Sequence, residues 1–563
     1  TQSGALVVGG LTTITATGKN ITLANESNDF KQAVKLVGAN VEIVDTNSID
    51  LGASTVTGTY KVTTGGAVID SGTQEITGVT TIVAGSSNNI TLDHSTNNFA
   101  AAVEITSGNN VEITDEDAID LGTSTVSGTY EITAGGAVTD SGGLDISGIT
   151  SIAAGSSNNI TLDHSTNNFV AAVKIVSGNN VAITDEDAID LGDSTVSGTY
   201  AITATAGNIL DSGTLAVTST STFTTNTDGA DIKLDTTTNR FTGSVTVNTS
   251  GTGGDAEIHG GSIPLGIIAS GEVGTLKLTT TSADITDEGA LVVLGATTID
   301  AGGADVTLNH GSSNLQGAVG VSGRNVSMTH PTAIDLGDST VTGTYGVTAT
   351  TGNITDTGAL TITGLTTLVT SADGGDITLN GTGHTFTGNV KVTTNETNSD
   401  KDAHAEINGG STIGLKIERG SEVQGNLTLI SSHANTITDE GGSGVVTVDG
   451  NLTVTTDANN GSITLNDLAV DGSIGLNTHG TGSAAVVNDA GLQFAASTVG
   501  GNLHATATTG NMTQSGALDI EGTTTLITSA NDATITLGTT SNAFTGALLI
   551  TTNDSGSDTA GDV

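Results

Sequence analysis

The sequence has 563 residues, of which 79 are glycine, 35% are hydrophobic and only 2% are aromatic. Its formal net charge of −46, with no visible basic patch, excludes a nucleic-acid binder, and an anionic membrane surface would repel it as well. The chain has no cysteine, no visible signal peptide and no apolar run near the roughly 20 residues of a membrane helix, so disulfides, thiolate metal sites and membrane insertion are excluded.

Short strands are predicted from the first residues onward, because apolar residues alternate with polar ones. In Val41-Glu-Ile43, Val111-Glu-Ile113 and Val181-Ala-Ile183 the outer residues stay apolar while the middle one varies. This pattern places the outer residues in a core and the middle residue in water. Gly, Asn, Asp and Ser bound the strands and favour turns. No helical periodicity is visible, so the sequence predicts an all-β fold.

A long repeat organises the first part of the chain. The stretch Gly85–Phe99 returns unchanged as Gly155–Phe169. Looser copies lie at Gly18–Phe30 and Asp376–Phe386. Self-similarity at a fixed period is typical of a stacked solenoid or array.

The apolar residues that open strands predict the length of one coil. After Ile90 they come at Val111, Val138 and Ile160, so one 70-residue repeat is interpreted as three coils. Between Ile21 and Ile535 the strand openings recur every 24–25 residues or so, at about the length of a β-helix coil and too close together for a propeller blade. The sequence therefore predicts a right-handed parallel β-helix of roughly 23 coils averaging about 24–25 residues.

The aromatic residues are predicted to fill the core. Six phenylalanines lie nine residues after a strand opening, where Leu315 replaces them once, and four tyrosines end a repeated Ser-Thr-Val-(Thr/Ser)-Gly-Thr-Tyr unit. A position that exchanges Phe for Leu is apolar, which favours core packing over ligand stacking. The residues are Phe30, Phe99, Phe169, Phe241, Phe386, Phe544, Tyr60, Tyr130, Tyr200 and Tyr345.

The repeat changes after residue 205. Residues 1–205 carry the 70-residue repeat, and residues 206–563 are predicted to continue the same solenoid with a looser 145-residue repeat and longer loops. The looser repeat is visible in Gly207–Leu215, which matches Gly352–Leu360. The polar stretches Asn248–Asp255 and Asn395–Ala403 are predicted to be loops that stand off the surface.

Sequence motifs in the second part of the chain resemble those of a known family. Gly352-Asn-Ile-Thr-Asp-Thr-Gly-Ala-Leu-Thr-Ile-Thr-Gly364, followed by Asp376-Ile-Thr-Leu-Asn380 and Phe386-Thr-Gly-Asn-Val390, is similar to the repetitive shaft of filamentous-haemagglutinin-type exoproteins of bacterial two-partner secretion. The resemblance implies a right-handed parallel β-helix, export through an outer-membrane pore, and adhesive or fibrous work at the cell surface. No functional residue of that family maps onto this chain.

Acidic residues recur after the strand openings and form two dense clusters, Asp115–Asp120 and Asp185–Asp193. One interpretation is Ca²⁺ held by carboxylate oxygens, and the other is local turns with a solvated acidic face. Both stay open, although the chain has neither a calcium-binding nonapeptide array nor a complete EF-hand loop. The recurrent aspartates are Asp70, Asp93, Asp140, Asp163, Asp211, Asp235, Asp287, Asp356 and Asp439.

No catalytic, cofactor-binding or metal site is predicted with named residues. His310 and His330 fall at the same phase of adjacent coils, but two imidazoles without a third ligand do not define a zinc site. His94 and His164 are expected to lie three coils apart. Because regular coils would place like residues in columns rather than in a converging site, an enzyme is not expected.

Two functions remain. The chain is expected to form an extracellular structural filament or matrix fibre, or to be the shaft of a secreted bacterial adhesin that presents binding loops. Residues Thr1–Leu6 recur at Thr513–Leu518, so the sequence starts in mid-repeat. Its expected partners are therefore more of the same chain or further copies, stacked coil on coil, and cell-surface or matrix components.

Overall fold

The computed structural model describes residues 1–563 except 252, 398–401, 433–435, 457–459 and 554–563. The described residues form strands, turns and bends without any helix, and thus without a helix that could cross a membrane. They divide into two compact units, Thr1–Thr281 and Ser282–Val563. The change of repeat near residue 205 falls inside the first unit.

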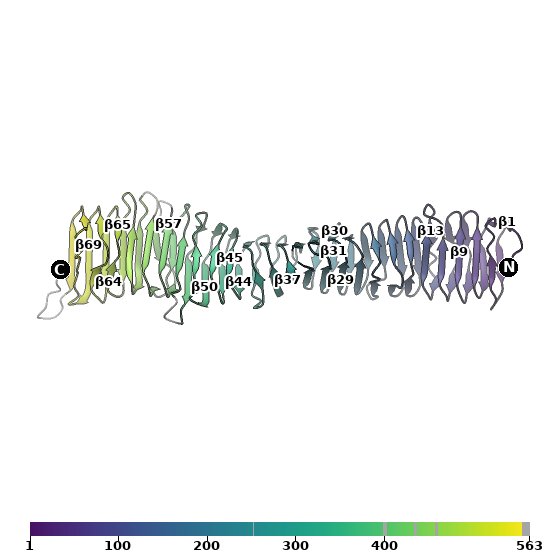
Figure 1. Ribbon diagram of the computed structural model, residues 1–563, viewed down its shortest axis with the longest axis horizontal. Helices are drawn as coiled ribbons and strands as arrows, with labels where there is room; N and C mark the ends of the chain where they lie inside the picture. The colour runs from purple at the N-terminus through teal and green to yellow at the C-terminus, as the bar shows by residue number, and fades with distance from the viewer. Residues whose placement is uncertain (252, 398–401, 433–435, 457–459, 554–563) are drawn as a thin grey trace. The chain divides into compact units, whose positions relative to one another are not determined.

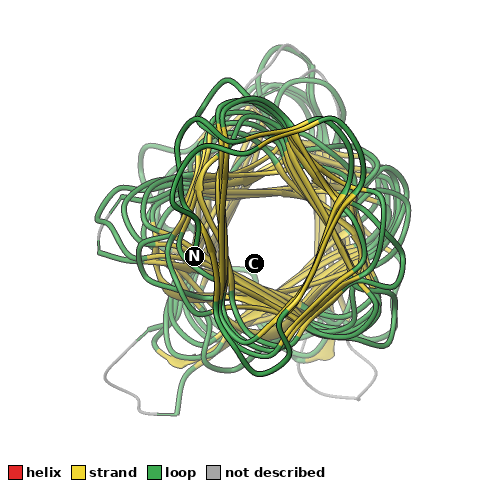
Figure 2. Ribbon diagram, turned by 90° about the vertical axis from the view of Figure 1, so that its right-hand side faces the viewer, coloured by secondary structure: helices red, strands yellow, loops and turns green. Residues whose placement is uncertain are grey.

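In the first unit, one coil consists of three short strands joined by turns. The strands β9 (Tyr60–Thr64), β10 (Val68–Asp70) and β11 (Gln74–Ile76) form one coil, and β12 (Thr80–Val83), β13 (Ile90–Leu92) and β14 (Asn98–Phe99) form the next. Each strand pairs in parallel with its counterpart, so that neighbouring coils lie side by side (Figure 1). The strands form the walls of the coils and the loops lie at their corners (Figure 2). The predicted parallel β-helix is confirmed, and the described residues of the two units together make about 26 turns against the roughly 23 predicted.

The 70-residue repeat is longer than three coils. Successive coils on one side place Ile90, Val111, Tyr130 and Thr150 in register. Three coils thus separate Ile90 from Thr150. The sequence equivalent of Ile90, Ile160, lies one strand further on and stacks in a different sheet. Since a strand is about one third of a coil, the repeat spans three and one third coils. Each copy of the repeat therefore begins on a different side of the coil from the copy before it.

The predicted coil from Val111 to Val138 was wrong for this reason. Val138 was expected to stack one coil after Val111, but Val111 is in register with Tyr130, and Val138 is in register with Ile119. Val111 and Val138 therefore open different strands of successive coils. The apolar signal is the same for every strand and does not say which strand pairs with which.

The predicted aromatic core is largely confirmed. Phe30, Phe99 and Phe169 are at most 3% exposed, and the four tyrosines are at most 1% exposed. Phe544 is the exception, because it is only partly buried in the last described coil. Burying a phenylalanine side chain contributes about 1.5–3 kcal/mol, in addition to the burial of the aliphatic residues that make up most of the core.

The second unit uses the same three-strand coil. Its first coils contain β39 (Ile285–Val293), β41 (Val306–Leu308), β42 (Asn314–Leu315) and β44 (Val326–His330), with β41 paired in parallel to β39 and β44. Further along, β48 (Ile354–Asp356) and β49 (Leu360–Ile362) pair with β51 (Ile377–Leu379) and β52 (Thr385–Phe386).

The two predicted loops lie between strands. The first connects β35 (Val245–Thr249) to β36 (Ala256–His259), and the second connects β53 (Val390–Asn395) to β54 (Ala405–Asn408). Residues 252 and 398–401 lie outside the described part of the chain. For the described residues, the prediction of loops at Asn248–Asp255 and Asn395–Ala403 is confirmed apart from the first residues of each stretch, which end a strand.

Candidate functional site

A buried pair of polar side chains joins consecutive coils at one corner. In the first unit Asp140 ends β20 (Val138–Asp140), and Asn167 lies in the following coil, fully buried. The Asn167 side-chain nitrogen donates to the Asp140 carboxylate at 2.6 Å and to the Leu162 carbonyl at 3.2 Å. Its oxygen accepts the N–H of Leu144 at 3.0 Å. We call this carboxylate–amide arrangement the coil clamp.

The carboxylate of the clamp also accepts hydrogen bonds from the turn that follows the next strand in the stack. Asp140 accepts the N–H groups of Asp163 at 3.0 Å and of His164 at 3.2 Å. Burial raises the pKa of Asp140, and the three donors oppose that rise. The donors come from residues Asp163, His164 and Asn167, all within the repeated stretch Gly155–Phe169. The clamp therefore gives a structural reason for the repeated asparagine of this stretch, since the other two donors are backbone groups.

The clamp recurs in both units. In two copies a glutamine replaces the aspartate and pairs with an asparagine, which keeps the hydrogen bond without a charge. In one copy a histidine replaces the asparagine. The pairs in direct contact are Gln2–Asn28, Asp70–Asn97, Asp140–Asn167, Asp211–Asn239, Asp356–His384 and Gln514–Asn542.

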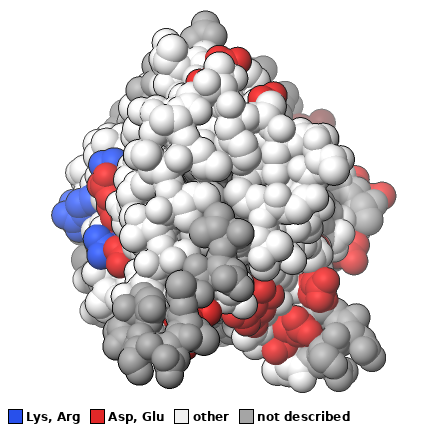
Figure 3. Space-filling view, turned by 90° about the vertical axis from the view of Figure 1, so that its left-hand side faces the viewer, with Lys and Arg blue, Asp and Glu red and all other residues white. Residues whose placement is uncertain are grey.

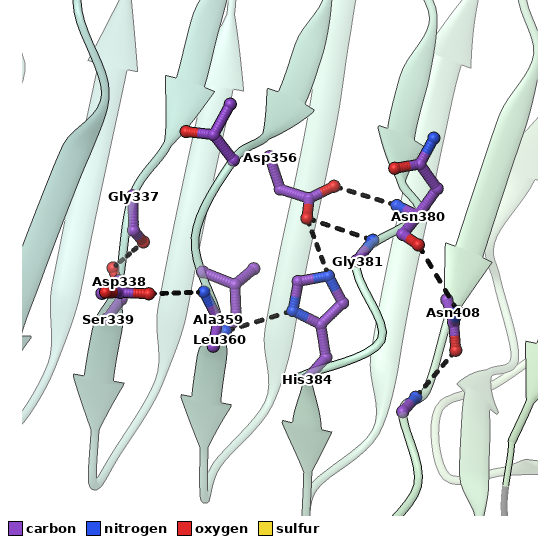
Figure 4. A network of polar contacts seen from close by, with 12 residues as sticks. Gly337, Asp338, Ser339, Asp356, Ala359, Leu360, Asn380, Gly381, His384 and Asn408 are labelled. Atoms are coloured by element: carbon purple, nitrogen blue, oxygen red, sulfur yellow. Dashed lines mark hydrogen bonds and ion pairs between the residues drawn. The ribbon is translucent and has the colours of Figure 1, made fainter.

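In the histidine copy, the ring lies between the same two kinds of partner, a carboxylate and a backbone N–H (Figure 4). His384 Nδ1 accepts the N–H of Leu360 at 3.1 Å, and Nε2 lies 3.0 Å from the Asp356 carboxylate. The ring must therefore be neutral, with its proton on Nε2. Burial lowers the pKa of His384, and the charge of Asp356 acts in the opposite direction. Asp356 also accepts N–H groups from Asn380 and Gly381.

This Asp–His pair is chemically similar to a catalytic dyad, but its placement differs. The Asp356 and His384 side chains are 2% and 0% exposed, Nδ1 accepts a hydrogen bond, and Nε2 faces the buried carboxylate at 3.0 Å. A general base must reach a proton on a substrate. Asp356 and His384 have no such access, and their arrangement is that of a structural clamp.

A second buried carboxylate lies at another corner and belongs to the predicted calcium clusters. Asp115 and Asp185 accept the N–H of Phe99 and Phe169, each at 2.9 Å. Both aspartates are at most 1% exposed. Burial raises the pKa of Asp185 to about 6, and the N–H of Phe169 opposes that rise. The first carboxylate of each cluster thus points inward and caps a backbone group.

The structure places the two clusters on different sides of the coils, because each 70-residue repeat advances by one third of a coil. The other cluster members, including Glu116, Asp117 and Asp187, are partly or fully exposed. Among the described residues, no group of three or more His, Asp or Glu side chains converges as metal ligands would. Calcium binding at these corners stays a prediction.

His330 takes the place of the inward aspartate in the second unit. It lies four residues after its strand opening, as Asp115 does, and its Nε2 accepts the N–H of Leu315 at 3.0 Å. Its Nδ1 lies 3.3 Å from the Thr332 carbonyl, and burial lowers the pKa of His330. His310 accepts an N–H from Ser312. His310 and His330 thus each accept a hydrogen bond from a different backbone N–H group. His94 and His164 follow strands of different sheets rather than the same sheet three coils apart.

The outer surface carries exposed ion pairs, and Lys233, Asp235, Glu257 and Lys277 join three of them into a small network. Arg324 binds Asp305 through two nitrogens at 2.8 Å and lowers the pKa of that carboxyl to about 2. Lys277 pairs with Glu257 at 2.6 Å. Figure 3 shows Lys and Arg in one small group beside Asp and Glu, and other acidic groups without them. Exposed pairs contribute about 0–1 kcal/mol each to stability.

Comparison with protein families gives one match. The model for "Repeats of unknown function (DUF5649)" matches eight segments, at residues 1–37, 38–106, 108–176, 178–248, 253–322, 323–393, 406–477 and 481–551. The chain belongs to this family. Three consecutive segments of this family begin at residues 38, 108 and 178, so the family unit has the length of the 70-residue repeat and hence of three and one third coils. Neither a curated protein nor a solved structure matches the chain.

Proposed function

We propose that this chain is an extracellular structural β-solenoid that forms a filament or matrix fibre at a bacterial cell surface, and that it is not an enzyme. The observation that carries the proposal is the repeated coil clamp. Its charged and amide groups are used to join coils, as Asp140 and Asn167 do, and they are buried away from substrates. Equivalent acidic clusters face different sides and do not build one site.

The charge of the chain supports an exposed location. The chain has 59 acidic residues and only 13 basic ones. A high net charge of one sign keeps proteins soluble and makes their surfaces repel one another. The parallel strands provide backbone hydrogen bonds along the stack without any disulfide. Such a fibre suits an environment where counter-ions screen the carboxylates.

Coil stacking with further β-solenoid, from the same chain or another copy, is part of the proposal. In the last described coil, β71 (Leu548–Asn553) pairs with β69 (Thr524–Asn531), and Leu548 and Leu549 are 43% and 53% exposed. A further strand, from the same chain or from another copy, would extend this coil-on-coil pairing. Sedimentation of the chain at increasing concentration tests this part, with concentration-dependent growth expected and a constant monomer contradicting self-stacking.

The second candidate is the shaft of a secreted adhesin, in line with the resemblance to filamentous-haemagglutinin-type exoproteins. The observation that favours it is the pair of loops between β35 and β36 and between β53 and β54. Loops on a rigid scaffold are common binding elements. Cell-surface or matrix components would be the partners of these loops.

Immunogold electron microscopy of the native cells distinguishes the two candidates. Antibodies against the Gly85–Phe99 repeat should label continuous fibres outside the cell if the chain is a filament. Single stalks that end at a partner surface would support the adhesin instead. Label confined to the cell interior would contradict both.

A further inference from the structure

The corner that contains Asp287 and Ser313 differs from every clamp described above. Ser313 lies two residues before Leu315, as Asn167 lies two residues before Phe169. Its Oγ accepts the N–H of Leu291 at 3.2 Å, which is the role of the amide oxygen in the other corners. Serine has no second polar atom that could replace the amide nitrogen.

A small cavity lies at this corner. Its volume is about 10 Å³, and its lining includes Asp287, Leu308, Ser313, Leu315 and His330. Asp287 and Leu308 are the sequence equivalents of Asp140 and Leu162, which accept the two hydrogen bonds of the Asn167 amide nitrogen. Two acceptors therefore border a space in the position of that nitrogen.

We propose that this cavity binds one buried water molecule, which completes the clamp in place of the amide nitrogen. The water donates to the Asp287 carboxylate and the Leu308 carbonyl, and it accepts the hydroxyl proton of Ser313. Three hydrogen bonds are typical of a buried water, and a cavity of about 10–15 Å³ is enough to hold one.

The neighbouring groups favour this occupant. Asp287 already accepts the N–H groups of Asn309 at 2.9 Å and His310 at 2.7 Å, and a carboxylate is a strong acceptor with room for a further donor. His330 Nε2 is engaged with Leu315 and does not compete for the water. Apolar residues such as Leu291, Met328 and Ile334 make up much of the rest of the lining.

The test compares the full-length chain with Ser313→Asn. Oxygen-17 relaxation dispersion measures the number of long-lived internal waters, and a crystal structure locates them. The expected result is one ordered water between Asp287, Leu308 and Ser313 in the native chain, and the loss of one long-lived water in Ser313→Asn. In the variant, the amide nitrogen should occupy the water position.

The matched control is Asn167→Ser in the first unit, which should gain one long-lived water between Asp140 and Leu162. An unchanged count in Ser313→Asn would overturn the proposal. So would density at the site with oxygen ligands at about 2.3–2.6 Å, because those distances belong to a cation rather than to water.

Discussion

Acidification should loosen the second unit at the His384 corner. Neutral His384 accepts the Leu360 N–H through Nδ1, and a proton on that nitrogen would place two donors against each other. Because burial lowers the pKa of His384 below that of the unfolded chain, the unfolded state binds more protons. The stability contribution is therefore present above about pH 6.5 and is lost as the pH falls below it.

The size of the effect follows from the contact that is lost. Leaving the buried Leu360 N–H unpaired costs about 1–3 kcal/mol. Asp356 faces the ring at 3.0 Å and favours imidazolium, which reduces the loss, whereas the Phe386 ring at 5.6 Å carries no charge. We expect exchange at the Leu360 amide to become about 5- to 100-fold faster between pH 7 and pH 5, after correction for intrinsic chemistry.

Hydrogen exchange of the whole chain measures this, with His384→Asn as the decisive variant. Asparagine should restore the Asn167-type clamp and remove the pH dependence at Leu360. The reverse substitution, Asn167→His, should introduce the same acid sensitivity at Leu144 in the first unit. If His384→Asn keeps the native pH dependence at Leu360, the clamp is not its origin and the reasoning is refuted.

Three further predictions concern the same corners and the core. The first unit should show the opposite pH dependence at Asp185. Its pKa of about 6 in the folded state means that ionising Asp185 lowers the stability of the folded state by up to ~3 kcal/mol, so stability should rise as the pH falls from 7 to 4. Thermal melts should show this trend, and Asp185→Asn should flatten it. Phe169→Ala should destabilise the first unit by about 3–5 kcal/mol because it leaves a cavity, and unchanged exchange rates around it would contradict the core assignment. Calcium should raise the melting temperature modestly through Asp115–Asp120 and Asp185–Asp193, and identical curves with calcium and with chelator at matched ionic strength would leave the turn interpretation alone.

The clamp and the inward carboxylates were only partly predictable. The sequence shows Asp140 and Asn167 as turn residues, and nothing local separates Asp115, which is buried, from Asp117, which is exposed. Their roles depend on N–H groups contributed by another coil, such as that of Phe99. The one available signal was position, since His330 occupies the fourth place after its strand opening, as Asp115 does.

The sequence by itself determined the β class, the parallel coils and most of the core, because alternation and turn chemistry act over a few residues. For this local reason Val41 and Ile43 are buried, whereas Glu42 between them points outward and is only partly buried. Only the tertiary structure decided which strands stack. The register depends on how many residues each corner consumes, and beyond three whole coils a further third of a coil separates Ile90 from its copy Ile160. Every contact between coils follows from that register, including the pairing of Asp140 with Asn167.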